Sequence, residues 1–147
     1  MSWPINNFMV IKSSKKTFKQ IAELIDKNDR ESHTNFNAFI PEPKDLDVQT
    51  LINWHEENWG CAWDGLYLTI NEKEQTIWYE TNSDPSDKVA AAIAKMFPDA
   101  RIEYGYEKAD DDEHEMFDVY SNGILVTHED KIVTWNEEDE DEDEDDE

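Results

Sequence analysis

The chain has 147 residues, of which 37% are hydrophobic and 12% aromatic, so it can bury the core of a single domain. Its formal net charge at pH 7 is −24, and removing the eleven consecutive acids of residues 137–147 still leaves −13 on the rest. An acidic excess of this size repels nucleic acid phosphates and anionic membranes and attracts basic proteins, which argues against direct binding of DNA or RNA.

The cysteine content and the hydropathy pattern bear on the compartment. Cys61 is the single cysteine of the sequence, so an internal disulfide is excluded, which fits a reducing cytosol. No segment approaches the roughly 18 consecutive apolar residues of a transmembrane helix, and the first residues lack a signal-peptide pattern. We therefore expect a soluble protein of the cytoplasm, the host cytoplasm if it is phage-encoded, that does not engage membranes.

The first half of the chain predicts a strand, a helix, a surface loop and a second helix. Residues 5–11 cluster apolar side chains, as a strand near the centre of a sheet does. Apolar residues recur at helical spacing over 18–25, after serines that can cap a helix. Residues 35–43 are expected to form a loop, and residues 48–59 a helix that Gly60 ends in the left-handed conformation.

The second half predicts further strands around one helix. Residues 66–70 and 76–81 alternate apolar and polar side chains and form the clearest hairpin of the sequence. Asp84 caps a helix with Pro85 at its first position, and that helix ends before Pro98. Residues 100–106 alternate again, and an acidic loop over 110–115 follows. Three short strands are expected around Phe117, Leu125 and Val133.

This order of elements predicts an α+β fold. The pattern β-α-β-β-α-β closes into an antiparallel sheet with helices on one face, the ferredoxin-like split βαβ arrangement. The helix over 48–59 is an insertion in the first crossover, and the last strands are a C-terminal β extension. We expect one domain over residues 1–136 and a disordered acidic tail over residues 137–147.

Several short motifs give the chain a family resemblance. They are Asn58-Trp59-Gly60 followed by Trp63, the strand end Ile77-Trp78-Tyr79-Glu80-Thr81, the pair Asp84-Pro85, and Phe97-Pro98 before Tyr104 and Tyr106. On these residues the chain resembles, over roughly residues 5–126, the YubB-type ferredoxin-like domain family, small proteins of phages and plasmids once filed as a domain of unknown function. The resemblance implies a mobile-element protein without an established catalytic activity. The motif residues Asn58, Trp59, Gly60, Trp63 and Trp78 are expected to be mainly structural.

No group of residues has the spacing of a catalytic or metal site. The acids of 110–115 lack the alternation and the later glutamate of a calcium loop, and the histidines are not at zinc-ligand spacing with Cys61. Acidic neighbours of Cys61 raise the pKa of a thiol, which argues against a nucleophile. There is no glycine-rich phosphate loop and no nucleophile elbow. We therefore predict no enzyme, no bound metal and no cofactor.

Two other features leave alternatives open. The one concentration of basic residues is either a solvated helix face or a docking site for the acidic tail or for a partner; it comprises Lys12, Lys15, Lys16 and Lys19. The tryptophans are either core residues or a stacking platform for a base or sugar; they are Trp54, Trp59, Trp63 and Trp78.

The acidic segments lead to the main functional hypothesis. An extended acidic tail carries one charge every ~3.3 to 3.6 Å, close to the phosphate spacing of about 3.4 Å along one strand of B-DNA. We expect a non-enzymatic phage or plasmid protein that binds a basic host protein, such as a DNA-handling or defence enzyme, and inhibits or diverts it. The partner-binding acids would be Asp110, Asp111, Asp112, Glu113 and Glu115 in the loop and Glu137, Glu138, Asp139, Glu140 and Asp141 in the tail.

Two other classes of function remain in competition. One is a small-ligand or nucleotide-sensing module that uses the aromatic hairpin and the loop after Trp59. The other is an assembly protein that forms a homodimer through an exposed strand edge.

Overall fold

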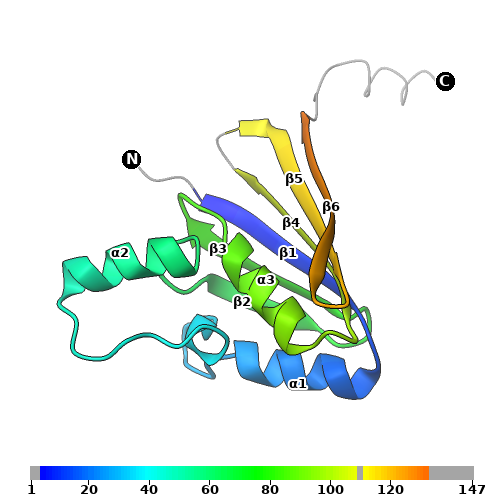
Figure 1. Ribbon diagram of the computed structural model, residues 1–147, viewed down its shortest axis with the longest axis horizontal. Coiled ribbons are helices and arrows are strands. Elements are labelled where there is room, and N and C mark those ends of the chain that lie inside the picture. Colours follow the sequence, from blue (N-terminus) through cyan, green and yellow to red (C-terminus); the bar gives the residue numbers. More distant parts are fainter. Residues whose placement is uncertain (1–3, 109–110, 133–147) are drawn as a thin grey trace.

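The computed structural model describes residues 4–108 and 111–132 and contains one sheet and three α-helices (Figure 1). The elements are β1 (Pro4–Lys12), α1 (Lys15–Ile25), a short 3-10 helix (Phe36–Ala38), α2 (Val48–Asn58), β2 (Leu66–Asn71), β3 (Thr76–Asn82), α3 (Asp87–Met96), β4 (Arg101–Lys108), β5 (Asp111–Ser121) and β6 (Ile124–Ile132).

The six strands form one antiparallel sheet in the order β2-β3-β1-β4-β5-β6. β1 lies in the interior of the sheet and pairs with β3 on one side and with β4 on the other. The hairpin of β5 and β6 continues the sheet beyond β4, so the two edge strands are β2 and β6. The fold is therefore α+β, as predicted, with the expected extra helix before β2 and the expected β extension after β4.

The core lies between the sheet and the helices α1 and α3 (Figure 1). Residues of β1 alternate between fully buried and more exposed positions, as the period of a strand requires. Both helices contribute to the same cluster as the buried strand residues, so both cover the same face of the sheet. Members of this cluster include Met9, Ile11, Phe18, Ile21, Ile77, Val89, Ile93 and Ile102.

The helix caps agree with the sequence at α1 and α2 and differ at α3. Ser14 caps α1 by accepting from the backbone N–H of Thr17, and Asp47 caps α2. The start of α3 was expected at Asp84-Pro85, but the helix begins at Asp87, with Ser86 as the preceding cap residue. The N–H of Ser86 is hydrogen-bonded to buried groups of the sheet, and this tertiary contact fixes where the helix begins.

The acidic segment after β4 also differs from the prediction. Residues 111–115 belong to the long strand β5 and do not form a loop. Two long strands replace two of the three short ones expected, and Val133 lies outside the described residues. Glu115 pairs with Glu107 on β4 and with Lys131 on β6, so the ladder on both sides outweighs the poor strand preference of acidic residues.

Gly60 ends α2 in the left-handed region, as expected, with φ of +96°. A Cβ atom at this position would lie 2.7 Å from Oδ1 of Asp87 and 2.8 Å from the carbonyl oxygen of Pro85. Gly60→Ala is therefore expected to lower the free energy of unfolding by about 2–4 kcal/mol, from backbone strain and from the clash with α3. Urea denaturation followed by circular dichroism measures this loss.

Gly123→Ala is the matched control for this variant. Gly123 also has a positive φ, of +78°, but its added Cβ would make an ordinary contact of 3.5 Å with the carbonyl oxygen of Ala94. This variant is expected to lose only the conformational cost, about 1–2 kcal/mol. If Gly60→Ala and Gly123→Ala lower the free energy of unfolding equally, the contact of residue 60 with α3 contributes nothing to the loss.

Candidate functional site

The sheet face opposite α1 and α3 carries a row of aromatic side chains. Phe8 on β1 pairs with Trp78 on β3 and with Gly105 on β4, and Gly105 pairs with Phe117 on β5. Directly opposite residues share one face of a sheet, so these four residues form a line across four strands. The three aromatic side chains are half-buried and lie outside the core cluster. We call this line the aromatic row and the surface around it the open face.

Gly105 allows the ring of Phe8 to lie against the backbone of β4. A Cβ atom at Gly105 would lie 2.4 Å from Cζ of Phe8 and 2.7 Å from its Cε1. Any other residue would push the ring away, since two carbon atoms do not approach this closely. The glycine therefore sets the position of Phe8 in the middle of the row.

Carboxylates surround the aromatic row. Glu80 on β3 and Glu107 on β4 both pair with Asn6, one on each side of β1. Neither carboxylate forms an ion pair with another described residue. Glu103 lies toward the other end of the face and is held by Lys12 at 3.1 Å and by Arg101 at 3.5 Å. The open face is thus aromatic in the middle and has at one end two glutamates that form no ion pair within the described part of the chain.

This arrangement suits a cationic partner. Aromatic faces attract guanidinium and ammonium groups, and carboxylates accept short charge-assisted hydrogen bonds from them. Nucleobases also stack on aromatic residues of open sheets, but they bring phosphates that the glutamates and the chain's charge of −24 repel. A basic segment of a protein fits the chemistry of the open face better than nucleic acid.

The motif residues of the expected family do not form one site. Trp59 is 1% exposed and donates its indole N–H to the carbonyl oxygen of Ile40 at 3.0 Å, while Asn58 donates to the carbonyl oxygen of Trp54. Trp63 is 49% exposed, which differs from the packing role expected for it, and Trp78 lies on the open face. The structure thus divides these tryptophans between the core and the surface.

His55 joins three segments of the chain. Its ring stacks on Trp59 at 3.9 Å between centroids, its Nδ1 contacts the carbonyl oxygen of Ala62 at 2.5 Å, and its Nε2 contacts Oε2 of Glu42 at 2.7 Å. Both ring nitrogens are used, so His55 has a structural role. The other histidines with described side chains also pair with carboxylates, His33 with Asp29 and His128 with Asp118.

Cys61 is fully buried, and burial together with the nearby carboxylate of Asp64 raises the pKa of its thiol far above the usual range. Burial also raises the pKa of Tyr79 and Tyr104, and it raises the pKa of Tyr120 to about 12. In the unfolded chain the thiol has a pKa of about 8.5 and the phenols have a pKa of about 10. Above these pH values the four groups stay protonated in the folded protein, whereas they ionise in the unfolded chain. An inert thiol is what the sequence predicted.

These raised pKa values predict a loss of stability at alkaline pH. The unfolded chain releases protons that the folded protein keeps, so the free energy of unfolding falls as pH rises above about 8.5 and more steeply above about 10. Urea denaturation at a series of pH values measures the slope. Tyrosinate absorbance of the three buried tyrosines should appear only as the protein unfolds; its appearance while circular dichroism is still native would contradict the burial.

The predicted partner-binding acids are only partly placed by the structure. Asp111, Asp112, Glu113 and Glu115 lie on β5, where Glu115 pairs with Glu107 of the open face. Asp110, Glu137, Glu138, Asp139, Glu140 and Asp141 lie outside the described residues. Their role in binding stays a prediction.

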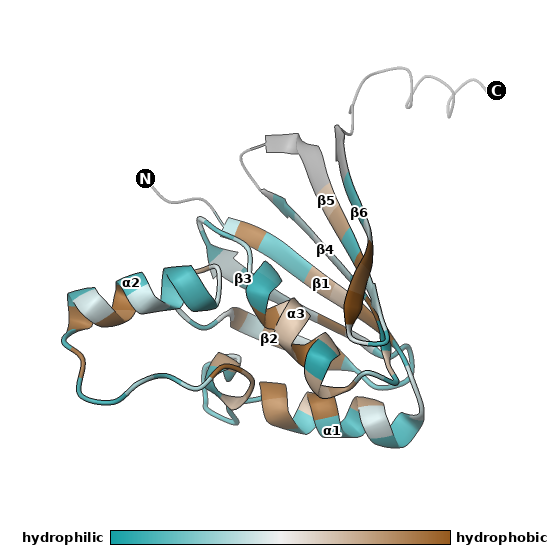
Figure 2. Ribbon diagram, viewed as in Figure 1, coloured by the Kyte–Doolittle hydropathy of each residue, from teal (hydrophilic) through white to brown (hydrophobic). Residues whose placement is uncertain are grey.

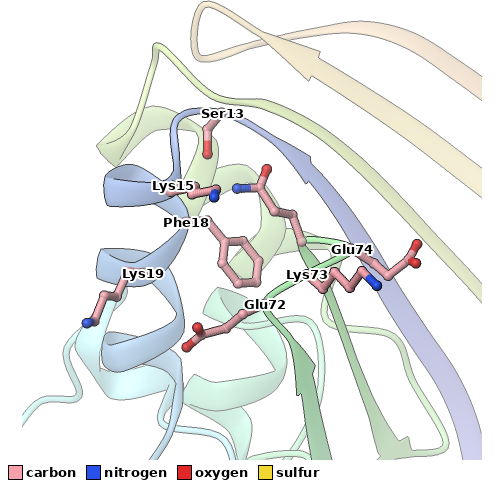
Figure 3. Close-up of a pocket in the computed structure, with 8 residues that line it drawn as sticks. Ser13, Lys15, Phe18, Lys19, Glu72, Lys73 and Glu74 are labelled. Carbon is pink, nitrogen blue, oxygen red and sulfur yellow. The ribbon is translucent and has the colours of Figure 1, made fainter.

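The lysines at the end of β1 and the start of α1 are mixed with carboxylates. Lys12 pairs with Glu103, and Lys15 and Lys19 line a groove of about 790 Å³ between α1 and the β2–β3 turn. Figure 3 shows Glu72 and Glu74 of the turn around the same groove, with Lys73 between them in the sequence and the ring of Phe18 in its centre. This alternation of charge favours a solvated helix face over an anion-binding patch.

The edge strand β6 begins with an exposed apolar run. Ile124, Leu125 and Val126 are 64%, 47% and 54% exposed, and Figure 2 shows this part of β6 as hydrophobic beside the end of α3. An apolar strand edge can pair with another strand. This run is the feature that bears on the homodimer alternative.

Among the described residues, no three histidine, cysteine, aspartate or glutamate side chains come close enough to hold a metal ion. None of the helices in that part of the chain is long and apolar enough to span a bilayer.

The comparisons with known proteins give one distant structural neighbour. No protein-family model matches the sequence, and no curated protein matches it significantly. Among solved structures, the chain is similar to a protein api92 from Yersinia pseudotuberculosis, described with the family model DUF1281, at 15% identity and a TM-score of 0.44. The match covers 63% of this chain and 33% of that one, so the chain spans about a third of its length. Membership of the YubB-type family stays a prediction.

Proposed function

We propose that this chain is a non-enzymatic binding protein that docks a basic segment of a partner protein on its open face. The observation that carries the proposal is the aromatic row of Trp78, Phe8 and Phe117 on the sheet face opposite α1 and α3, with the carboxylates of Glu80 and Glu107 beside it. The partner would be a host protein that normally handles nucleic acid, and occupation of its basic surface would inhibit or divert it.

The acidic segments would add long-range attraction to this face. Residues 111–115 continue β5 beside the end of β4 that carries Glu107, so their charge lies on the same sheet. Residues 137–147 add eleven more acidic charges. Such charges speed association and make it sensitive to salt, because the Debye length is only about 8 Å at physiological ionic strength.

The fold and the origin of the chain belong to the same proposal. We regard β1, α1, β2, β3, α3 and β4 as a ferredoxin-like split βαβ unit, with α2 inserted and β5–β6 added. The strand order β2-β3-β1-β4 supports this assignment. A phage or plasmid origin rests on the resemblance of the tryptophan-containing motifs to YubB-type proteins.

The proposal is tested with charge variants of identical net charge. The protein captures its partner from a bacterial lysate at low salt, and the affinity for the identified partner is then measured by calorimetry. Glu80→Gln with Glu107→Gln is expected to weaken binding about tenfold or more, since two charge-assisted contacts are lost. The control pair Glu23→Gln with Glu56→Gln, on exposed helix positions, should bind nearly as the wild type. Equal losses in both pairs would reduce the interaction to general charge attraction and contradict the proposal.

The acidic tail is tested separately by deleting residues 137–147. The deletion is expected to slow association and to reduce its salt dependence, with a smaller change in the dissociation rate. Stopped-flow kinetics at several salt concentrations measure both rates. A partner that no longer binds the shortened chain at all would place the site on the tail and away from the open face.

One observation favours the alternative of a small-ligand module. A cavity of about 320 Å³ lies beside Trp63, which is within the size range of small-molecule sites. A ligand there would quench tryptophan fluorescence, and Trp63→Ala would abolish the effect without unfolding the protein. The homodimer alternative rests on Ile124, Leu125 and Val126 and is decided by light scattering.

A further inference from the structure

The cavity beside Trp63 borders the open face. It lies between the start of β2 and the end of β3, where Leu66 and Glu80 contribute to its wall. Glu80 pairs with Leu66 on one side and with Asn6 on the other, so its strand position belongs both to this cavity and to the open face. A partner segment that lies on the aromatic row can therefore reach the cavity with one side chain.

The indole of Trp63 forms one wall of this cavity and is held in place by its neighbours. The ring is 49% exposed, and its other contacts include an edge-to-face arrangement with His55 at 5.3 Å between centroids. His55 is itself fixed by Ala62, Glu42 and Trp59, as described above. The indole is thus held in place and half-open before any ligand arrives, which lowers the entropic cost of binding.

The cationic groups of the cavity wall already have partners. Lys27 pairs with Asp64 at 3.1 Å, and Asp64 also accepts hydrogen bonds from Thr34 and from the backbone N–H of Phe36. His33 is bonded to a carboxylate outside the wall. Glu80, in contrast, forms no ion pair with any other described residue. The cavity therefore offers an aromatic face and an unpaired carboxylate, and not a free cation.

We propose that this cavity receives the guanidinium group of an arginine from the basic partner, stacked on Trp63 and bonded to Glu80; this inference rests on the proposed function. A guanidinium is planar, stacks on indole rings and donates two parallel hydrogen bonds to a carboxylate. A lysine ammonium offers a point charge without the plane. A nucleotide would bring its phosphates toward Glu80, which forms no ion pair with another described residue. Arginine is therefore the side chain that matches both the indole of Trp63 and the carboxylate of Glu80.

The test uses three short peptides with the full chain. They are Ac-Gly-Ser-Arg-Ser-Gly-amide, the same peptide with lysine, and the same peptide with citrulline, which keeps the shape of arginine without its charge. The readout is the indole N–H signal of Trp63 in a ¹⁵N-labelled sample at physiological salt, identified by its absence in Trp63→Phe. The arginine peptide is expected to shift this signal saturably, the lysine peptide to bind at least fivefold more weakly, and the citrulline peptide to leave the signal unchanged.

Glu80→Gln and Glu23→Gln supply the matched variants. Glu80→Gln should weaken binding of the arginine peptide at least fivefold, as measured by the Trp63 signal. Glu23→Gln, which has the same net charge, should not weaken it. Equal binding of the arginine and lysine peptides, or no shift at Trp63, would overturn the inference. The two proposals can fail separately. If the arginine peptide does not bind as expected, but the double variant Glu80→Gln with Glu107→Gln still weakens binding of the partner protein, the open face remains the binding site and only the arginine pocket is wrong.

Discussion

Replacing Asn7 by leucine is expected to lower the free energy of unfolding by about 3–5 kcal/mol, because several buried polar groups lose their partners at once. Asn7 is fully buried on the core side of β1. Its Oδ1 accepts from the N–H of Ser86 at 3.2 Å and from the hydroxyl of Tyr104, and its Nδ2 donates to Oγ1 of Thr81 at 3.0 Å. Leucine has a similar volume, so the loss reports hydrogen bonding more than packing.

The neighbouring Asn6 gives the control for this variant. It lies one residue away on the open face, so Asn6→Leu is expected to change stability by no more than about 0.5 kcal/mol. Urea denaturation of both variants at neutral pH gives the comparison. A loss below about 1 kcal/mol for Asn7→Leu would mean that the network does not fix the start of α3 on the sheet.

Replacing Gly105 by valine is expected to weaken partner binding about tenfold or more while the net charge stays the same. The new Cβ would lie 2.4 Å from Cζ of Phe8, so the ring must leave the centre of the aromatic row. The clash involves the far end of a side chain that faces away from the core, so the expected loss of stability is below about 2 kcal/mol. Because no charge changes, lost binding would point to the aromatic row itself and not to acidic attraction.

Two further variants show whether a loss of binding comes from the aromatic row or from the edge of β6. Phe8→Leu removes the same ring without adding a Cβ at Gly105 and should weaken binding in the same direction. Val126→Ala alters an exposed residue of the β6 edge and should leave binding unchanged. If Val126→Ala weakens binding and Gly105→Val does not, the partner adds to the strand edge, and the open face is not the site. Circular dichroism of each variant shows whether it is folded.

The local elements of the fold were predictable because their signals are local. Ser14 and Asp47 cap helices where the sequence placed caps, and Gly60 ends α2 with a positive φ. These residues act within one or two turns of backbone, so composition and spacing reveal them. The β2–β3 hairpin was predictable for the same reason, since its period and its polar turn lie within a short stretch.

The missed features depend on contacts between distant residues. The acids of 111–115 have low strand propensity, and the strand is extended there through pairing of Asp111 and Glu115 with β4 and of Glu115 with β6. The start of α3 depends on Asn7, 79 residues before Ser86 in the sequence. Helix capping statistics favour Asp84-Pro85 there, and a buried side chain of β1 overrides them.

The candidate site was hidden for the same reason. The sequence pattern places Phe8 and Trp78 in strands, but their adjacency follows from the register of β1 with β3, which a single sequence does not give. The sequence does contain one indication of this site. Gly105 lies between Tyr104 and Tyr106 in a predicted strand, and a glycine within a strand often marks close approach by another group. The motif predicts a mainly structural role for both Trp59 and Trp63; Trp59 is buried, and Trp63 is 49% exposed.

Nuclear magnetic resonance mapping of the complex tests the central claim most directly. The captured partner, or its basic segment, is titrated into ¹⁵N-labelled protein, and chemical-shift changes are followed for the backbone and the indole groups. We predict that the largest changes fall on Phe8, Trp78, Gly105 and Phe117, with smaller ones on α1 and α3. Changes confined to the helices, to the β6 edge or to residues 137–147, with the aromatic row unaffected, would contradict a binding site on the open face.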